Sequence, residues 1–157
     1  ITMPTAIDNV MSAIKTIAES VPGIGLVYDQ LPLVNSEDKA KKLLVPKGTS
    51  TINVLSFFPR TRAIDKAEGF VIEEVGREIV FIHQYAYNFE KNSQKILNNF
   101  IEALTDTFNQ NQTLNNTIAE HTKMELIDTQ LGMYGTVLVH ISALRMTVYK
   151  SQSNIAT

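Results

Sequence analysis

Three histidines carry the most versatile side chains of this sequence, because imidazole binds metals and exchanges protons near neutral pH. They are His83, His121 and His140. His83 and His140 fall inside two β-rich segments, at positions that can face each other across a sheet. A zinc site needs a third ligand, and no His-x-x-x-His or carboxylate spacing supplies one. The pattern favours structural histidines over a pair of ligands, and neither a metal nor a cofactor is expected.

Two other short patterns could suggest a catalytic or a phosphate-binding site. Glu73 and Glu74 are adjacent in a predicted hairpin turn, and neighbouring strand residues point to opposite faces, so these carboxylates do not form an acid–base pair. The stretch 23–25 lacks the third glycine and the following helix of a phosphate-binding loop, and it is interpreted as a helix stop. No serine lies in a Gly-x-Ser-x-Gly elbow. The residues therefore predict no enzyme active site.

Composition sets the broad class of the protein. The 157 residues are 44% hydrophobic and 19% charged, which suits one globular domain over residues 1–157. The net charge of −2 creates no field that would attract nucleic acid or an anionic membrane. Cysteine is absent, which excludes disulfides and thiolate metal sites. No apolar run approaches about 18 residues and no signal-peptide pattern is present, so we expect a soluble protein made in the cytoplasm.

The first half of the chain predicts one helix and a long connection. Apolar residues recur at steps of three and four from Ile7 to Val21, which indicates an amphipathic helix that begins near Pro4. A short extended piece follows at residues 26–28. Residues 29–48 show no period and are interpreted as a long loop or arm, a length that is uncommon inside a compact domain.

The central strands are predicted from β-rich runs. A strand over residues 51–58 ends at Pro59, and a charged segment follows it. Residues 70–72 and 79–82 then flank a turn, which predicts a hairpin with Gly76 at its tip.

The second half predicts a strand–helix–strand–strand unit. A helix spans residues 89–110, and two extended segments at 120–130 and 134–149 are separated by residues 131–133. The buried parity changes along the last segment, so we expect either a bulge near Ser142-Ala143 or a strand covered on both faces, by helices and by a neighbouring subunit. The tail, residues 151–157, is polar and predicted to be loose.

Together these elements predict an α+β fold. We expect a mixed, mostly antiparallel sheet of about four to six strands, with two main helices packed on one face. The strand near residues 79–89 is apolar on both faces, which indicates that water is excluded from both sides. One of these faces, expected to be an outer interface, contains Ile79, Phe81, Tyr85, Tyr87 and Phe89.

The basic residues fall into two groups that are either a solvated surface or a contact surface. A contact surface would meet an acidic neighbouring protein, or DNA passing through a channel. No aromatic residues interleave with these cations, so base stacking is not indicated. The first group, in the arm, is Lys39, Lys41, Lys42 and Lys47, and the second, after the first long strand, is Arg60, Arg62 and Lys66.

The order of elements resembles that of the tail terminator (tail completion) proteins of long-tailed bacteriophages, the family of the lambda tail terminator. The closing run, residues 139–149, is similar to the family's last strand, and the Gln112-Thr113-Leu114 turn is similar to the turn after its long helix. The resemblance covers nearly the whole chain and is one of pattern. The 29–48 arm is longer than this pattern predicts.

The resemblance implies a structural virion protein of the phage neck, made in the host bacterial cytoplasm. It implies a hexameric ring that caps the tail tube, stops its polymerisation and meets the head-side connector or head-closure protein, with DNA able to pass through the lumen. No catalysis or cofactor, and no membrane, is implied. Combining it with the surface patterns above, we expect the partner contacts to involve Arg60, Arg62, Lys66, Lys41, Lys42, Phe81, Tyr85 and Tyr87.

Three alternatives remain open at the level of sequence. Another neck protein, such as a head-closure or adaptor protein, would differ mainly in its partner. A small enzyme or ligand-binding α+β domain would need a pocket between sheet and helices. A nucleic-acid-binding regulator would need a concentrated basic face, which scattered lysines do not favour.

Overall fold

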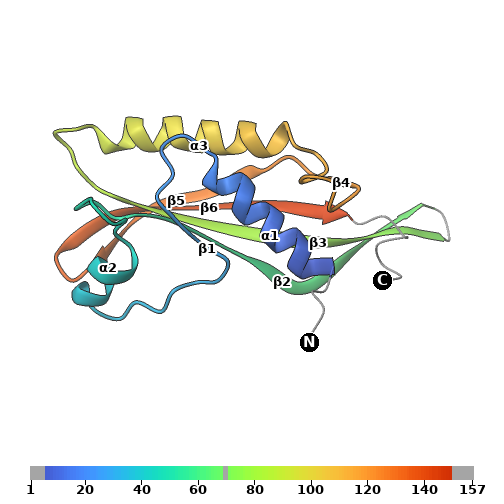
Figure 1. Cartoon of the computed structure of the whole chain (residues 1–157), viewed down its shortest axis with the longest axis horizontal. Coiled ribbons are helices and arrows are strands. Elements are labelled where there is room, and N and C mark those ends of the chain that lie inside the picture. Colours follow the sequence, from blue (N-terminus) through green and yellow to red (C-terminus); the bar gives the residue numbers. More distant parts are fainter. Residues whose placement is uncertain (1–5, 69–70, 150–157) are drawn as a thin grey trace.

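The computed structural model describes residues 6–68 and 71–149, and it describes no side chain between residues 61 and 75. Pro4, Phe70 and the tail at 151–157, which figured in the sequence predictions, lie outside the described residues. Within them, three helices and six strands form an elongated body (Figure 1). The helices are α1 (Ala6–Glu19), α2 (Glu37–Leu43) and α3 (Ser93–Asn109). The strands are β1 (Leu26–Tyr28), β2 (Asn53–Glu68), β3 (Val71–Ala86), β4 (Glu120–His121), β5 (Glu125–Tyr134) and β6 (Val137–Tyr149).

The strands form one mixed sheet in the order β1-β2-β3-β6-β4, and β5 pairs with β6 on the same side as β4. β1 runs parallel to β2, and every other pairing is antiparallel. The two long helices, α1 and α3, lie over the same face of this sheet (Figure 1). The predicted α+β fold, with a mostly antiparallel sheet and two main helices on one face, is confirmed.

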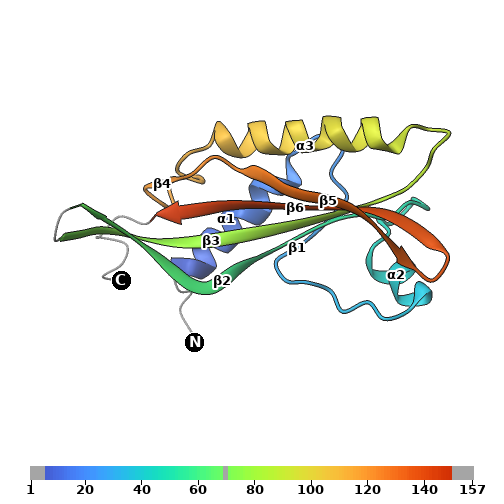
Figure 2. The same ribbon diagram turned by 180° about the vertical axis from the view of Figure 1, so that it is seen from behind.

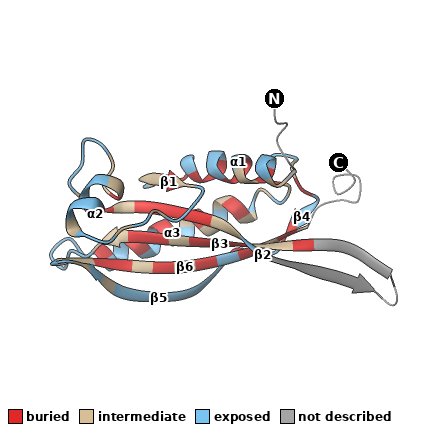
Figure 3. Cartoon of the chain, turned by 90° about the horizontal axis from the view of Figure 1, so that it is seen from below, coloured by how far each residue is buried: buried red, intermediate tan, exposed pale blue. Residues whose placement is uncertain are grey.

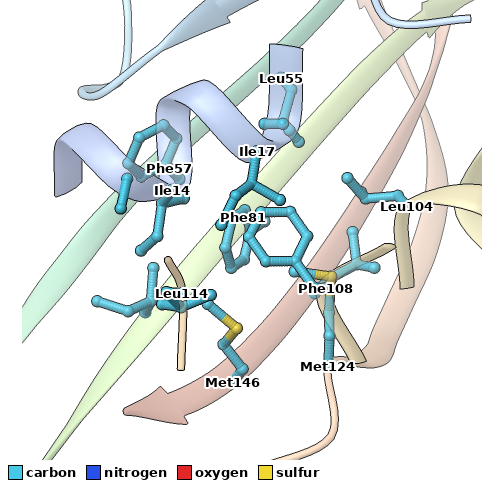
Figure 4. Packing of buried hydrophobic residues seen from close by; sticks show 14 of the residues in the cluster. Ile14, Ile17, Leu55, Phe57, Phe81, Leu104, Phe108, Leu114, Met124 and Met146 are labelled. Atoms are coloured by element: carbon cyan, nitrogen blue, oxygen red, sulfur yellow. The ribbon is translucent and has the colours of Figure 1, made fainter. Parts of the chain in front are cut away.

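The main core fills the space between this face and the two long helices. Phe81 of β3 lies at its centre, with ring centroids 5.8 Å from Phe57 and 5.4 Å from Phe108 (Figure 4). Ile14 and Ile17 reach the same cluster from α1, on the stripe that the period of the sequence predicted. The prediction that Phe81 lies on an outer face is therefore wrong, because its side chain is fully buried.

The predicted arm contains an ordered helix, so the prediction of a loop is wrong over residues 37–43. Ser36 caps α2 by accepting the backbone N–H of Lys39 at 3.2 Å. Ala40 and Leu44 are fully buried in a second, smaller cluster on the opposite face of the sheet. A helix of seven residues is too short to display an apolar period, which is why the sequence did not reveal it.

Two predicted breaks in the central strands are also wrong. β2 continues beyond Pro59 to Glu68, with a register shift between Pro59 and Ala63. β3 is continuous through Gly76, which lies opposite Tyr149 of β6. A Cβ added at Gly76 would lie 2.5 Å from the Tyr149 ring. This glycine is therefore required by the close approach of an aromatic side chain and not by a turn.

The last two strands are joined differently from the prediction. Residues 131–133 belong to β5, and the chain turns instead at Gly135, whose φ is +62°. β6 pairs with β3 without interruption, so the expected bulge near Ser142-Ala143 is wrong. The extra residue is Ile127 of β5, which falls between the pairs Leu126–Leu144 and Asp128–Ala143.

Both faces of β6 are covered over part of the strand, and the cover of the second face around Val139 and Ile141 comes from the same chain; cover by a neighbouring subunit stays a prediction. Leu144 and Met146 face the long helices, whereas Val139 and Ile141 belong to the cluster beneath α2. Successive strand residues point to opposite faces, so the change of parity reflects two separate covers along one regular strand.

Replacing Phe81 with Ala should lower the free energy of unfolding by about 3–5 kcal/mol, because it leaves a cavity at the centre of the main core. The matched control is Phe89→Ala, since Phe89 is 81% exposed. Its effect should stay below about 1 kcal/mol. Urea unfolding followed by circular dichroism measures both, and equal effects would contradict the position of Phe81 in the core.

Candidate functional site

His83 of β3 points to the face of the sheet that the main core covers, and its ring stacks on Phe100 with centroids 4.4 Å apart. Its Nε2 is 3.1 Å from Oδ1 of Asn53. The Nδ2 of Asn53 donates to the carbonyl oxygen of Gly23 at 3.0 Å, which fixes the orientation of this amide. Oδ1 therefore accepts, and Nε2 of His83 carries the proton. Nδ1 is left buried without a hydrogen-bond partner.

The environment of His83 favours the neutral ring. Burial, with a smaller contribution from His140, lowers the pKa of His83 from 6.5 to about 3. A ring that stays neutral across the physiological range and bonds a fixed amide serves as a structural connector between β2 and β3. It lacks the access to solvent or substrate that a proton-transfer group needs.

His140 shares this face of the sheet but contacts a different set of groups. Tyr85 lies directly opposite it and His83 lies one pair further along, so the two histidines are diagonal neighbours. The Ser93 Oγ is hydrogen-bonded to Nε2 of His140 at 2.8 Å and accepts the backbone N–H of Asn88 at 2.8 Å. Burial lowers the pKa of His140 as well. The network fixes the first turn of α3 on β6.

His121 closes the other end of the same helix. Its Nε2 lies 2.8 Å from the carbonyl oxygen of Phe108 and 3.0 Å from that of Asn111. These two carbonyls also accept the backbone N–H groups of Asn111 and Leu114, so the imidazole adds a side-chain contact that joins β4 to the end of α3. Each of the three histidines thus contacts the fold itself, and no group of three or more metal-ligating side chains occurs among the described residues.

The predicted cationic contacts do not form one site. Lys41 and Lys42 are exposed on α2, where Lys41 lies 3.5 Å from Glu37. Arg60 is exposed on β2 and lies 3.6 Å from Glu78. α2 packs against Ile52 and Val54, so Arg60 is roughly 20 Å further along β2 at about 3.3 Å per residue. Arg62 and Lys66 belong to β2, but their side chains are outside the described part.

The three aromatic residues predicted to contact partners differ in how far they are buried. Phe81 is in the core, Tyr85 is half-buried, and Tyr87 is exposed near the end of β3. The partner contacts of Tyr85 and Tyr87 stay a prediction.

The sequence reasoning missed the most exposed element of the sheet. Within residues 6–68 and 71–149, β5 pairs with β6 on one side and has no partner strand on the other, so it forms an edge of the described sheet. Figure 3 shows it exposed along its length, whereas β3 and β6 are buried over much of theirs. Four large apolar side chains are exposed on this strand: Leu126, Ile127, Leu131 and Met133. The run Leu126-Ile127 and the later Leu131 and Met133 in the sequence were a signal, but nothing local indicated that the helices would leave them uncovered.

A shallow groove of about 350 Å³ runs between α3 and β5. Its walls include Ile101 of α3 and Leu126 of β5, and Ser142 of β6 also lines it. The Ser142 hydroxyl is buried and has no hydrogen-bond partner. The groove adjoins the exposed apolar side chains of β5 and belongs to the same surface.

Comparison with models of known protein families gives no match, and comparison with curated proteins finds no similar sequence. In the described part of the chain, no helix has the length and apolar character needed to cross a membrane. The candidate site therefore stands on geometry, and the feature that it offers is the exposed apolar edge at β5.

Stability should fall as the pH is lowered from 6.5 towards 3, because the unfolded chain protonates His83 in this range and the folded chain does not. One such group contributes a slope of up to about 1.4 kcal/mol per pH unit. Urea unfolding between pH 7 and 5 measures it, in a range where few carboxylates titrate. The variant His83→Gln, which keeps a donor for Asn53, should show a smaller slope. An unchanged slope would contradict the neutral buried ring.

Proposed function

We propose that this chain is a structural protein of a bacteriophage neck, a tail terminator whose copies close into a ring of six on the end of a tail tube. The observation that carries the proposal is the edge strand β5. It combines unpaired backbone groups with four exposed large apolar side chains. Soluble folds usually protect such an edge, and an uncovered one marks a surface that another chain covers.

The mechanism is steric and interfacial. Subunits joined head to tail bury the β5 edge, and a rotation that closes at six ends the assembly as a ring instead of a filament. One rim of the ring covers the last layer of the tube and stops further addition. The other rim presents a surface to the head-side connector, and the lumen leaves a path for DNA.

The β2–β3 ribbon supports contacts beyond the ring. Residues 71–75 of β3 pair with β2 but not with β6, so this end of the ribbon extends past the rest of the sheet (Figure 1). An extended ribbon suits contact with the tube or connector. We assign this contact to Arg60, with Arg62 and Lys66 further along the same strand, and assign Lys41 and Lys42 to the interface between subunits.

A head-closure or adaptor protein remains the nearest alternative, since it would also assemble through this edge and would differ in its partner. A small ligand-binding domain is favoured by one observation, the unpartnered Ser142 hydroxyl at the α3–β5 groove. The groove is shallow and lined by both polar and apolar side chains, so it would enclose little of a small ligand, and a broad protein contact suits it better.

Purified protein should reach a mass six times that of the chain as its concentration increases, measured by light scattering and sedimentation, with closed rings seen by electron microscopy. Met133→Asp should shift the protein to monomers, because it places a charge in the apolar interface. Lys15→Asp on the exposed side of α1 is the control and should assemble normally.

The partner is tested on isolated tail tubes of the virus that encodes the chain. Labelled protein should bind at one end of each tube and should stop the addition of free tube protein. Binding along the tube wall, or at neither end, would contradict the terminator function. Binding to the connector alone would favour the head-closure alternative.

A further inference from the structure

The segment between β1 and α2 forms neither helix nor paired strand and exposes two large apolar side chains. We call residues 30–35 the β1–α2 segment. Leu31 is 53% exposed and Leu33 is 77% exposed, whereas Pro32 and Val34 between and after them are more buried. The residue before a proline is restricted to extended conformations, so Leu31 is held in a strand-like geometry by Pro32.

The backbone of this segment is available for pairing. Among the described residues, none makes a backbone hydrogen bond to residues 30–35, although β1 before them pairs with β2 and α2 after them is a capped helix. An extended segment with free backbone groups and alternating apolar side chains has the properties of an unpaired β-strand.

The chain also carries an edge that such a strand would fit. β5 has one partner, β6, and its outer side faces solvent. β5 lies in front of the sheet in Figure 2, with α1 behind it, so it is at the edge opposite to β1. Leu131 and Met133 of β5 pair with His140 and Leu138 of β6. Because His140 points to the face of the sheet that α3 covers, Leu131 and Met133 point to that same face. They are 55% and 64% exposed.

The alternation of side chains along the β1–α2 segment suits pairing with β5. In a strand, residues i and i+2 share both a side-chain face and the direction of their backbone groups. Leu31 and Leu33 can therefore bond β5 while their side chains extend the apolar stripe of Leu131 and Met133. Pro32 then directs its missing donor away from β5, which is the position where an edge strand tolerates proline.

Charge complementarity favours the same contact. The segment leads directly into α2, whose lysines Lys39, Lys41 and Lys42 outnumber the acids Glu37 and Asp38, so that the helix has a small net positive charge. On the face of the sheet that faces α3, Glu102 and Asp106 of α3 are exposed beside β5. Complementary potentials of this kind orient two partners and raise their association rate.

We propose that the β1–α2 segment of one copy pairs as an added strand with β5 of a second copy. The inference rests on the proposed function only in that both require self-association, and it names the two surfaces that meet. Donor and acceptor differ, so the contact is head to tail, and each copy retains a free donor and a free acceptor until the ring closes.

The absence of cysteine makes a crosslinking test unambiguous, because every thiol is then one that has been introduced. Leu33→Cys and Leu131→Cys proteins are prepared separately, mixed in full-length form and oxidised. Paired strands bring Cβ atoms within about 5.5 Å, close enough for a disulfide. The mixture should give crosslinked dimers, and the double variant should give a ladder of larger species. Leu33→Cys mixed with Lys15→Cys, on exposed α1, is the control and should give only the background level.

Leu33→Asp should weaken self-association by about tenfold or more, measured by sedimentation, without changing urea unfolding, because this side chain is exposed in the single chain. Rings that form without the Leu33–Leu131 crosslink would overturn this contact and leave the proposed function standing. Specific crosslinks in a protein that never binds tail tubes would support the contact and overturn the proposed function. Crosslinks at the control level, or only within single chains of the double variant, would overturn the contact.

Discussion

The packing of Phe81 between Phe57 and Phe108 is the contact on which the rest of the fold depends, because it joins the two central strands to the long helix α3. Together with α1, this helix covers one face of the sheet. A helix is about 10 Å wide and strands are about 4.8 Å apart, so two helices cover roughly four strands. The sheet is wider than that. The bare edge at β5 is therefore a geometric consequence of a six-stranded sheet beneath two helices.

The polar side chains inside this layer have structural tasks that follow from their burial. His83 links β2 and β3 through Asn53, and His140 holds the start of α3 through Ser93. A buried imidazole without such a partner would cost free energy, so each is placed where the fold supplies one. Nε2 of His83 and Nε2 of His140 are thereby bonded within the fold, whereas Nδ1 of His83 and the Ser142 hydroxyl are buried without a partner.

The sequence predicted the parts of the fold that local periodicity determines. The stripes of α1 and α3, the extended β1 and the long closing strand followed from spacing alone. It failed at Pro59 and Gly76, because pairing with β3 at Pro59, and with both β2 and β6 at Gly76, overrode two local strand breakers. It also failed to separate Phe81 from Phe89, which share one parity in the sequence. Phe81 is buried beneath the helices, whereas Phe89 lies beyond the end of β3 and is exposed. α2 has no local signature in the sequence because it is too short to show a period. The exposure of β5 has none because it depends on where the two long helices lie.

The irregularity at Ile127 has a consequence for the newly made chain. Two flat, apolar strand edges pair readily with each other, and this symmetric pairing leads to aggregates. An extra residue in β5 twists the edge, and the exposed acid Asp128 beside Ile127 repels its equivalent on an approaching β5, whereas Glu125 is paired with Arg145 of β6. An irregular, charged edge disfavours pairing with an identical edge of another copy, but it can still pair with a short, flexible strand. In the proposed assembly, this irregular edge would disfavour pairing between two copies of β5, so that each chain folds before its edge meets the β1–α2 segment of another copy.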